Sequence, residues 1–137
     1  MTLIARFGPG VRILQPVACL ATDTVGKWMA IRGDRVNGKW RVERADPRDE
    51  TKMPAVGVLV SKSTPTVGVM HMFGPLRDFY LGLNFGKSYF IGDNGVLSET
   101  LPTVLPGGYA LVQKVGESMS SDLLWVAGDL GVIKRVG

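Results

Sequence analysis

The sequence has little of what catalysis or metal binding usually requires. It contains one cysteine, Cys19, and one histidine, His71, in 137 residues. A single cysteine excludes a disulfide within the chain, and zinc needs three or four nitrogen, sulfur or oxygen ligands. A Ser-His-Asp or Cys-His arrangement would have to use His71, which stands between two methionines in an apolar run. We therefore expect a protein that is not an enzyme and has no metal and no cofactor.

Other familiar signals are also missing. The sequence has no glycine-rich phosphate-binding motif and no dinucleotide fingerprint. No run of about 18 apolar residues is present, so we expect no membrane-spanning segment. The first residues lack a basic start followed by a long apolar stretch, which predicts no secretory signal. The lone Cys19 is expected to be a buried structural residue, because a reactive thiol needs an accessible electropositive site.

Positive charge is concentrated in the first third of the chain. Residues 1–52 contain ten Lys or Arg and six Asp or Glu, whereas residues 53–137 contain six of each. The whole net charge of +4 therefore comes from the first 52 residues. Such a basic excess suits an acidic surface on a partner, or more weakly a nucleic acid. The simpler interpretation, a solvated charged face, remains open.

Turn-forming residues are abundant. The 18 glycines and 8 prolines follow no collagen-like period, which indicates many turns between short strands. No segment has helical apolar spacing over ten or more residues, and about nine to eleven strands are predicted. The expected fold is all-β, a compact antiparallel β-sandwich or barrel. At most one short helical turn is expected, near residues 47–52, where Asp46-Pro47 is a typical helix start and Pro54 a stop.

Individual segments give more specific predictions. The pair Asn37-Gly38 is the strongest short hairpin signal in the chain. Residues 39–44 alternate between apolar and charged side chains, as expected for a half-solvated antiparallel strand. Residues 55–61 and 67–73 are almost continuously apolar, which is typical of strands buried on both sides, in a core or between subunits.

The chain is expected to form one β domain from residue 16 to residue 137, since its length suits a single core. Residues 1–15 precede it and contain two apolar runs separated by Gly8-Pro9-Gly10. This segment is either an N-terminal arm that contacts a neighbouring molecule or an edge strand of the same domain. The sequence does not decide between these alternatives.

Residues 81–126 contain a distinctive order of glycines, short apolar strands and prolines. This order resembles a recurrent β module of small tailed-bacteriophage virion proteins, found in capsid decoration proteins, head fibres and some tail-fibre segments. The resemblance extends over residues 25–126, and its motifs are structural rather than catalytic. The matching residues are Gly82, Leu83, Gly86, Tyr89, Phe90, Gly95, Leu97, Ser98, Pro102, Gly107, Val115, Gly116, Ser118 and Ser120.

The resemblance implies a phage virion accessory structural protein. Such a protein would be a capsid decoration (cement) protein or a head-fibre component that binds and stabilises the shell. Its implied partners are its own copies, as a homotrimer, and the major capsid protein or another virion protein. Its implied location is the virion, after synthesis in the bacterial host cytoplasm. The resemblance leaves head or tail attachment, stoichiometry and host open.

The residues themselves give an independent reason for self-association. Residues 55–60, 67–73, 109–112 and 123–127 lack polar alternation, and one domain of this size has limited interior in which to bury them. Unpaired strand edges are a further liability. A closed symmetric assembly removes both problems, although the sequence does not indicate which strands form the subunit interface.

Basic and aromatic residues of the first third are the candidate shell or partner contacts. Two other functions remain open for them: a tail-fibre or receptor- and glycan-binding module with exposed aromatic rings, and a single-stranded nucleic-acid-binding β-barrel. Trp28 and Trp40 also have a purely structural interpretation, as core residues facing each other across a hairpin. The candidate contact residues are Arg6, Arg12, Trp28, Arg32, Trp40 and Arg41.

Overall fold

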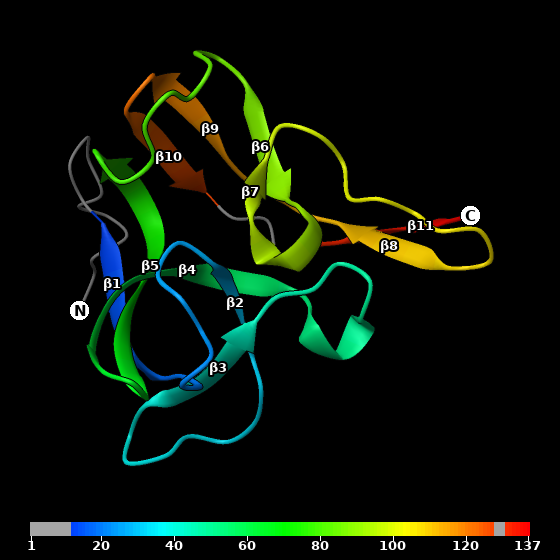
Figure 1. The fold of residues 1–137 in the computed structure, drawn as a ribbon. Coiled ribbons are helices and arrows are strands. Elements are labelled where there is room, and N and C mark those ends of the chain that lie inside the picture. Colours follow the sequence, from blue (N-terminus) through cyan, green and yellow to red (C-terminus); the bar gives the residue numbers. More distant parts are fainter. Residues whose placement is uncertain (1–11, 128–130) are drawn as a thin grey trace.

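The computed structural model describes residues 12–127 and 131–137, which fold into eleven strands and two single 3-10 turns (Figure 1). The all-β prediction is therefore confirmed. The strands are β1 (Ile13–Ala18), β2 (Trp28–Ile31), β3 (Trp40–Arg44), β4 (Ala55–Thr64), β5 (Val67–Arg77), β6 (Ser88–Ile91), β7 (Leu97–Ser98), β8 (Tyr109–Val112), β9 (Lys114–Ser120), β10 (Leu123–Ala127) and β11 (Ile133–Val136).

The first five strands close into a barrel. Their order is β1-β3-β2-β4-β5, and antiparallel pairing of β1 with β5 completes the ring. The pairing of β1 with β3 is parallel, whereas every other strand pair of the barrel is antiparallel. The expected antiparallel arrangement thus holds except at this one pair. Closure leaves these strands without a long free edge, which is the usual protection against edge-to-edge aggregation.

Strand β5 belongs to both the barrel and a second sheet. Its first part pairs with β1 and β4, and its last part, from Phe73 to Arg77, pairs with β10. Gly74 lies near the start of this last part, and its φ of +95° is in the left-handed region that glycine adopts without steric cost. The second sheet continues in the order β5-β10-β9-β6-β7. It packs against the outside of the barrel.

Two apolar clusters result, one inside the barrel and one between the barrel and the second sheet. Strands β2 and β4 contribute to both, because their side chains alternate between the two faces. In β2, Met29 points into the barrel, whereas Trp28 and Ala30 join the cluster between the layers. In β4, Leu59 points into the barrel, whereas Val58 joins the cluster between the layers. The prediction of burial on both sides is therefore confirmed for residues 55–59, whereas Ser61, at the end of the predicted run, is exposed.

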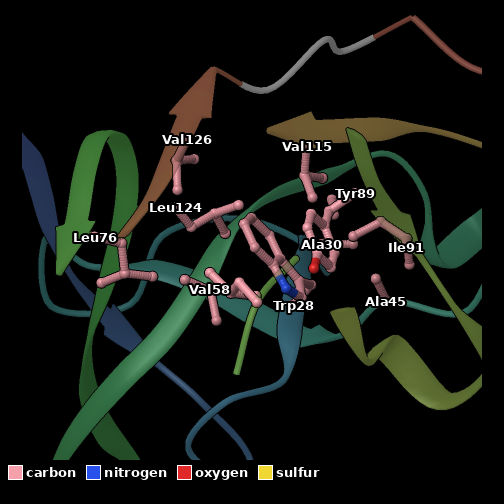
Figure 2. Packing of buried hydrophobic residues seen from close by; sticks show 12 residues of the cluster. Trp28, Ala30, Ala45, Val58, Leu76, Tyr89, Ile91, Val115, Leu124 and Val126 are labelled. Carbon is pink, nitrogen blue, oxygen red and sulfur yellow. The ribbon is translucent and has the colours of Figure 1, made fainter. Parts of the chain in front are cut away.

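The cluster between the layers, which we call the interlayer core, surrounds Trp28 (Figure 2). Its barrel side comes from β2 and β4, and its other side comes from the second sheet. The fully buried residues on the second sheet include Ile91, Val115, Leu124 and Val126. This core fixes the second sheet onto the barrel.

The predicted hairpin turn and the predicted helical turn are both present. Asn37 and Gly38 have positive φ angles of 51° and 76°, the conformation of a type I′ turn, and the flanking Val36 and Lys39 form a β-bridge. The helical turn covers Glu50–Lys52 and is capped by the Asp49 side chain rather than by Asp46. A second 3-10 turn, Asp93–Gly95, follows β6.

Strands β8 and β11 form a separate two-stranded ribbon that extends from the body of the molecule (Figure 1). At the other end of the chain, β1 begins at Ile13, so the expected boundary after residue 15 falls within a strand of the barrel. Residues Ile13–Ala18 pair with β5, and only Val17 and Ala18 also pair with β3. Among the described residues, the first part of β1 therefore pairs on one side only. Most of the expected N-terminal arm lies outside the described residues.

Candidate functional site

A pocket with a volume of about 480 Å³ lies at the end of the barrel where β1 ends and β3 begins. Parallel pairing of these two strands places Ala18 beside Arg41. Three basic side chains, those of Arg32, Lys39 and Arg41, line the pocket together with mostly apolar residues of segments 18–21 and 66–67. The pocket thus combines an apolar floor with a cationic rim. We call it and the adjoining Arg35 and Trp40 the barrel-end site.

The loop of residues 32–39 positions the basic side chains. The Arg32 amide donates to the carbonyl of Arg41 over 2.8 Å, and its guanidinium Nε donates to the carbonyl of Val42 over 3.2 Å. Gly33 follows with a φ of +142° and passes close to the Arg41 guanidinium, which is 3.8 Å from the position that a Cβ would occupy. The loop therefore holds Arg32 and Arg41 next to each other on the edge of the barrel.

Trp40 connects the site to the barrel. The indole is half-buried and packs against the barrel cluster. The guanidinium of Arg35 lies over its ring, 4.4 Å from the ring centroid. Such a cation-π contact holds the long Arg35 side chain against the surface. The result is a flat aromatic and guanidinium platform beside the pocket.

Residues 18–21 form one wall of the pocket, and Lys62 from β4 holds the end of this segment in place. Its ammonium donates to the carbonyls of Asp23, over 2.7 Å, and of Leu20, over 3.3 Å. The Asp23 carboxylate accepts from the Leu20 amide over 2.8 Å. Cys19 is buried in this wall, as expected, and burial raises the pKa of its thiol although the nearby Lys62 opposes that effect. The Cys19 thiol is therefore neutral at pH 7 and belongs to the frame of the site.

The barrel-end site is strongly positive. Residues 32–41 contain four basic side chains, of Arg32, Arg35, Lys39 and Arg41, against the single carboxylate of Asp34, a net charge of +3. Within residues 12–127 and 131–137, none of the four is in a salt bridge with a carboxylate. Adjacent cations without counter-charges repel one another. Binding of an anion relieves this repulsion and is therefore favoured. The arrangement suits an anionic group that also presents apolar surface.

Three of the six predicted contact residues meet at this site: Arg32, Trp40 and Arg41. Arg12 is exposed but precedes the other end of β1, about 20 Å from the pocket by the rise of a six-residue strand. Arg6 lies outside the described residues. The predicted contact residues did not include Arg35 and Lys39, which flank the hairpin signal Asn37-Gly38.

Trp28 is the one predicted contact residue that the structure contradicts. Its side chain is 1% exposed and lies in the interlayer core, so it does not reach a partner. The reason is that β2 is covered on both faces, by the barrel interior and by the second sheet. Trp28 and Trp40 also belong to different clusters, so they are not a facing pair across one hairpin.

His71 is fully buried in β5, away from the pocket. Its Nε2 lies 3.1 Å from the carbonyl of Gly74, which makes this nitrogen the protonated donor. Burial lowers the pKa of His71, and the Gly74 carbonyl partly offsets that effect. Across the described part of the chain, no three His, Cys, Asp or Glu side chains come together as a possible metal site.

The described residues also contain no helix that is long and apolar enough to cross a membrane. In comparisons with known proteins, no family model, no curated protein and no solved structure matched this chain. The barrel-end site is therefore assessed on its own geometry.

Proposed function

We propose that the protein is a phage virion accessory structural protein that binds an acidic surface of the shell through the barrel-end site. Its role would be that of a capsid decoration (cement) protein or a head-fibre component. The observation that carries the proposal is the cluster of Arg32, Arg35, Lys39 and Arg41 around Trp40, which has no carboxylate partner in the described part of the chain. The resemblance over residues 25–126 supports the virion setting.

Cementing is the mechanism that this setting implies. Each copy bridges neighbouring shell subunits, and many copies act together. Avidity then makes release slow even where a single contact is weak. The protein would be made in the bacterial cytoplasm and reside on the virion. Homo-oligomers, with the trimer as the form that the resemblance implies, would multiply the number of basic contacts per particle.

The direct test is co-sedimentation with shells of the encoding phage that were assembled without this protein. The site variant is Arg32→Glu combined with Arg41→Glu, and the control is Arg77→Glu combined with Lys87→Glu, which makes the same charge change at exposed positions outside the pocket. We expect the site variant to lose at least about tenfold in affinity, because it reverses two contacting charges.

Equal affinity of the two double variants would reject the barrel-end site as the shell contact. Failure of the wild-type protein to sediment with shells would reject the virion proposal itself. The N-terminal arm is tested separately by deleting residues 1–11, a boundary that leaves β1 intact. Undiminished decoration and unchanged oligomeric mass after this deletion would exclude a role of the arm.

A second candidate function is binding of single-stranded nucleic acid. The stacked Arg35 and Trp40, 4.4 Å apart, beside three further cations on a small barrel are its supporting observation. Basic grooves with aromatic platforms bind the backbone and the bases of single strands. This candidate predicts that affinity for an oligonucleotide falls steeply with ionic strength and falls further in Trp40→Ala. Absence of oligonucleotide binding at low salt would reject it.

A further inference from the structure

The outer face of the second sheet carries a surface of unusual composition. In β10, Leu124 and Val126 point into the interlayer core, so the alternating Trp125 and Ala127 point outward. Trp125 is paired with Glu117 of β9. Together with Lys114 and Met119, these outward residues line a shallow hollow of about 430 Å³. We call this surface the sheet face.

Two large apolar side chains, those of Trp125 and Met119, lie on the sheet face. Trp125 is in edge-to-face contact with Phe73 of β5, with ring centroids 5.9 Å apart, and Met119 is 52% exposed. Antiparallel sheets that have one face against the core usually present polar residues to water on the other. Aromatic residues and methionine are instead the types enriched in protein interfaces. The sheet face is thus built like an interface rather than like a solvated surface.

Two opposite charges lie within this apolar surface. Lys114 and Glu117 form an ion pair, and their side chains are 42% and 53% exposed. Among the described residues they are the two charged residues that line the hollow, and their charges cancel. By contrast, the barrel-end site carries a net charge of +3 over residues 32–41, and two copies brought together there would repel each other.

We propose that a second copy of this chain packs face to face on the sheet face. A twofold contact brings the same surface together twice, so a patch with one cation and one anion is complementary to itself. Lys114 of one copy then faces Glu117 of the other and the reverse, while Trp125 and Met119 are buried between the sheets. An acidic or basic partner would instead require a net charge on the surface. The inference deepens the self-association in the proposed function and rests on it.

The stoichiometry follows from the symmetry. A twofold contact gives an even number of copies: a dimer, or a pair of trimers where the trimer implied by the resemblance also forms. Light scattering on a sizing column should therefore give a mass of two or six times the 14.8 kDa of one chain. A mass of three chains would overturn the inference but leave the proposed trimer intact. A monomer would overturn both.

The sharper experiment uses two charge variants, Lys114→Glu and Glu117→Lys. Alone, each variant places like charges opposite each other across the contact, and we expect the mass to fall by half. Mixed in equal amounts, the two variants present complementary faces, and the wild-type mass should return. A foreign protein, a glycan or a purely intramolecular role of the ion pair would give no recovery on mixing, and that result would overturn the inference.

Misfolding is controlled with a matched pair of aromatic substitutions. Trp125→Ser removes the main apolar contact, whereas Phe85→Ser changes a ring that is 76% exposed and is outside the sheet face. We expect Trp125→Ser to be half the mass of the wild type and Phe85→Ser to keep the wild-type mass, with both variants retaining the wild-type circular dichroism spectrum. Retention of the wild-type mass by a folded Trp125→Ser would also overturn the inference.

Discussion

The interlayer core around Trp28 and the barrel-end site around Trp40 differ in burial and in charge, although their two tryptophans have similar sequence surroundings. Both tryptophans follow a lysine in a strand of the basic first third. Trp28 is enclosed by two layers and is 1% exposed. Trp40 has one side on the barrel cluster and the other under the guanidinium of Arg35.

The difference teaches that the place of an aromatic residue, between two layers or at the end of the barrel, decides its role. β2 is covered by the barrel interior on one face and by the second sheet on the other, so both sets of its side chains are in a core. β3 contributes Val42 and the partly buried Trp40 to the barrel cluster, and Trp40 is the first residue of this strand, at the end of the barrel beside the pocket. Trp40 is consequently left half-exposed beside the charged loop.

The largest effect is expected from Trp28→Ala. Removing a fully buried indole leaves a cavity between the layers, and truncations of this kind typically cost about 3–5 kcal/mol. Chemical denaturation should show this loss in the free energy of unfolding. A cost below that of Trp40→Ala would contradict the assignment of Trp28 to the central core.

A smaller loss is expected from Gln113→Leu. The side-chain amide of Gln113, a buried residue between β8 and β9, is hydrogen-bonded to the first residue of β4. Its Oε1 accepts from the Ala55 amide and its Nε2 donates to the Ala55 carbonyl, both over 2.7 Å. Leucine leaves both backbone groups of Ala55 without these bonds, at a cost of about 1–3 kcal/mol. Equal unfolding free energies of Gln113→Leu and wild type in urea would show that the two bonds are dispensable.

Trp40→Ala should reduce stability less than Trp28→Ala, by about 1–2 kcal/mol, because only part of the indole is removed from water. It should nevertheless weaken binding at the barrel-end site, since Arg35 loses the ring beneath it. Parallel measurements of unfolding and of shell co-sedimentation separate the two effects. If Trp40→Ala bound shells with wild-type affinity, the platform of Arg35 and Trp40 would have no part in shell binding.

The smallest effect is expected from pH. Burial lowers the pKa of folded His71 below its ordinary value of 6.5, so the unfolded chain takes up a proton at a higher pH than the folded protein does. The free energy of unfolding should therefore fall as the pH drops below about 6.5. Comparing wild type with His71→Gln at pH 7.5 and 5.5 checks this, because part of the pH dependence should disappear in the variant. An unchanged pH dependence would exclude His71 as its source.

Much of the fold is predictable from local patterns in the sequence. The type I′ turn at Asn37-Gly38 formed because only residues that tolerate positive φ fit it. The helical turn near residues 47–52 formed as well, but Asp49 caps it while Asp46 instead accepts from the Arg48 amide over 2.9 Å. Which of the two carboxylates, Asp46 or Asp49, caps the turn therefore depends on the hydrogen bonds that the surrounding structure offers to each.

The candidate site was only partly predictable. The charge count located the basic excess in residues 1–52, and Arg32, Trp40 and Arg41 did come together. The sequence did not show that Trp28 is buried and they are not. It also grouped Arg12 with them, although the whole length of β1 lies between Arg12 and the pocket. Long-range pairing, such as that of Ala18 with Arg41, brings segments together irrespective of local pattern.

The sequence by itself determined that the protein is all-β, that a tight turn lies at Asn37-Gly38 and that residues 55–59 are buried on both sides. These are local properties, set by side-chain branching, by glycine and asparagine at positive φ and by apolar alternation. Only the tertiary structure decided that β1 closes a barrel, that β5 passes at Gly74 into a second sheet, and which tryptophan is buried. The reason is that burial depends on what packs against each strand from distant parts of the chain, which no single segment encodes.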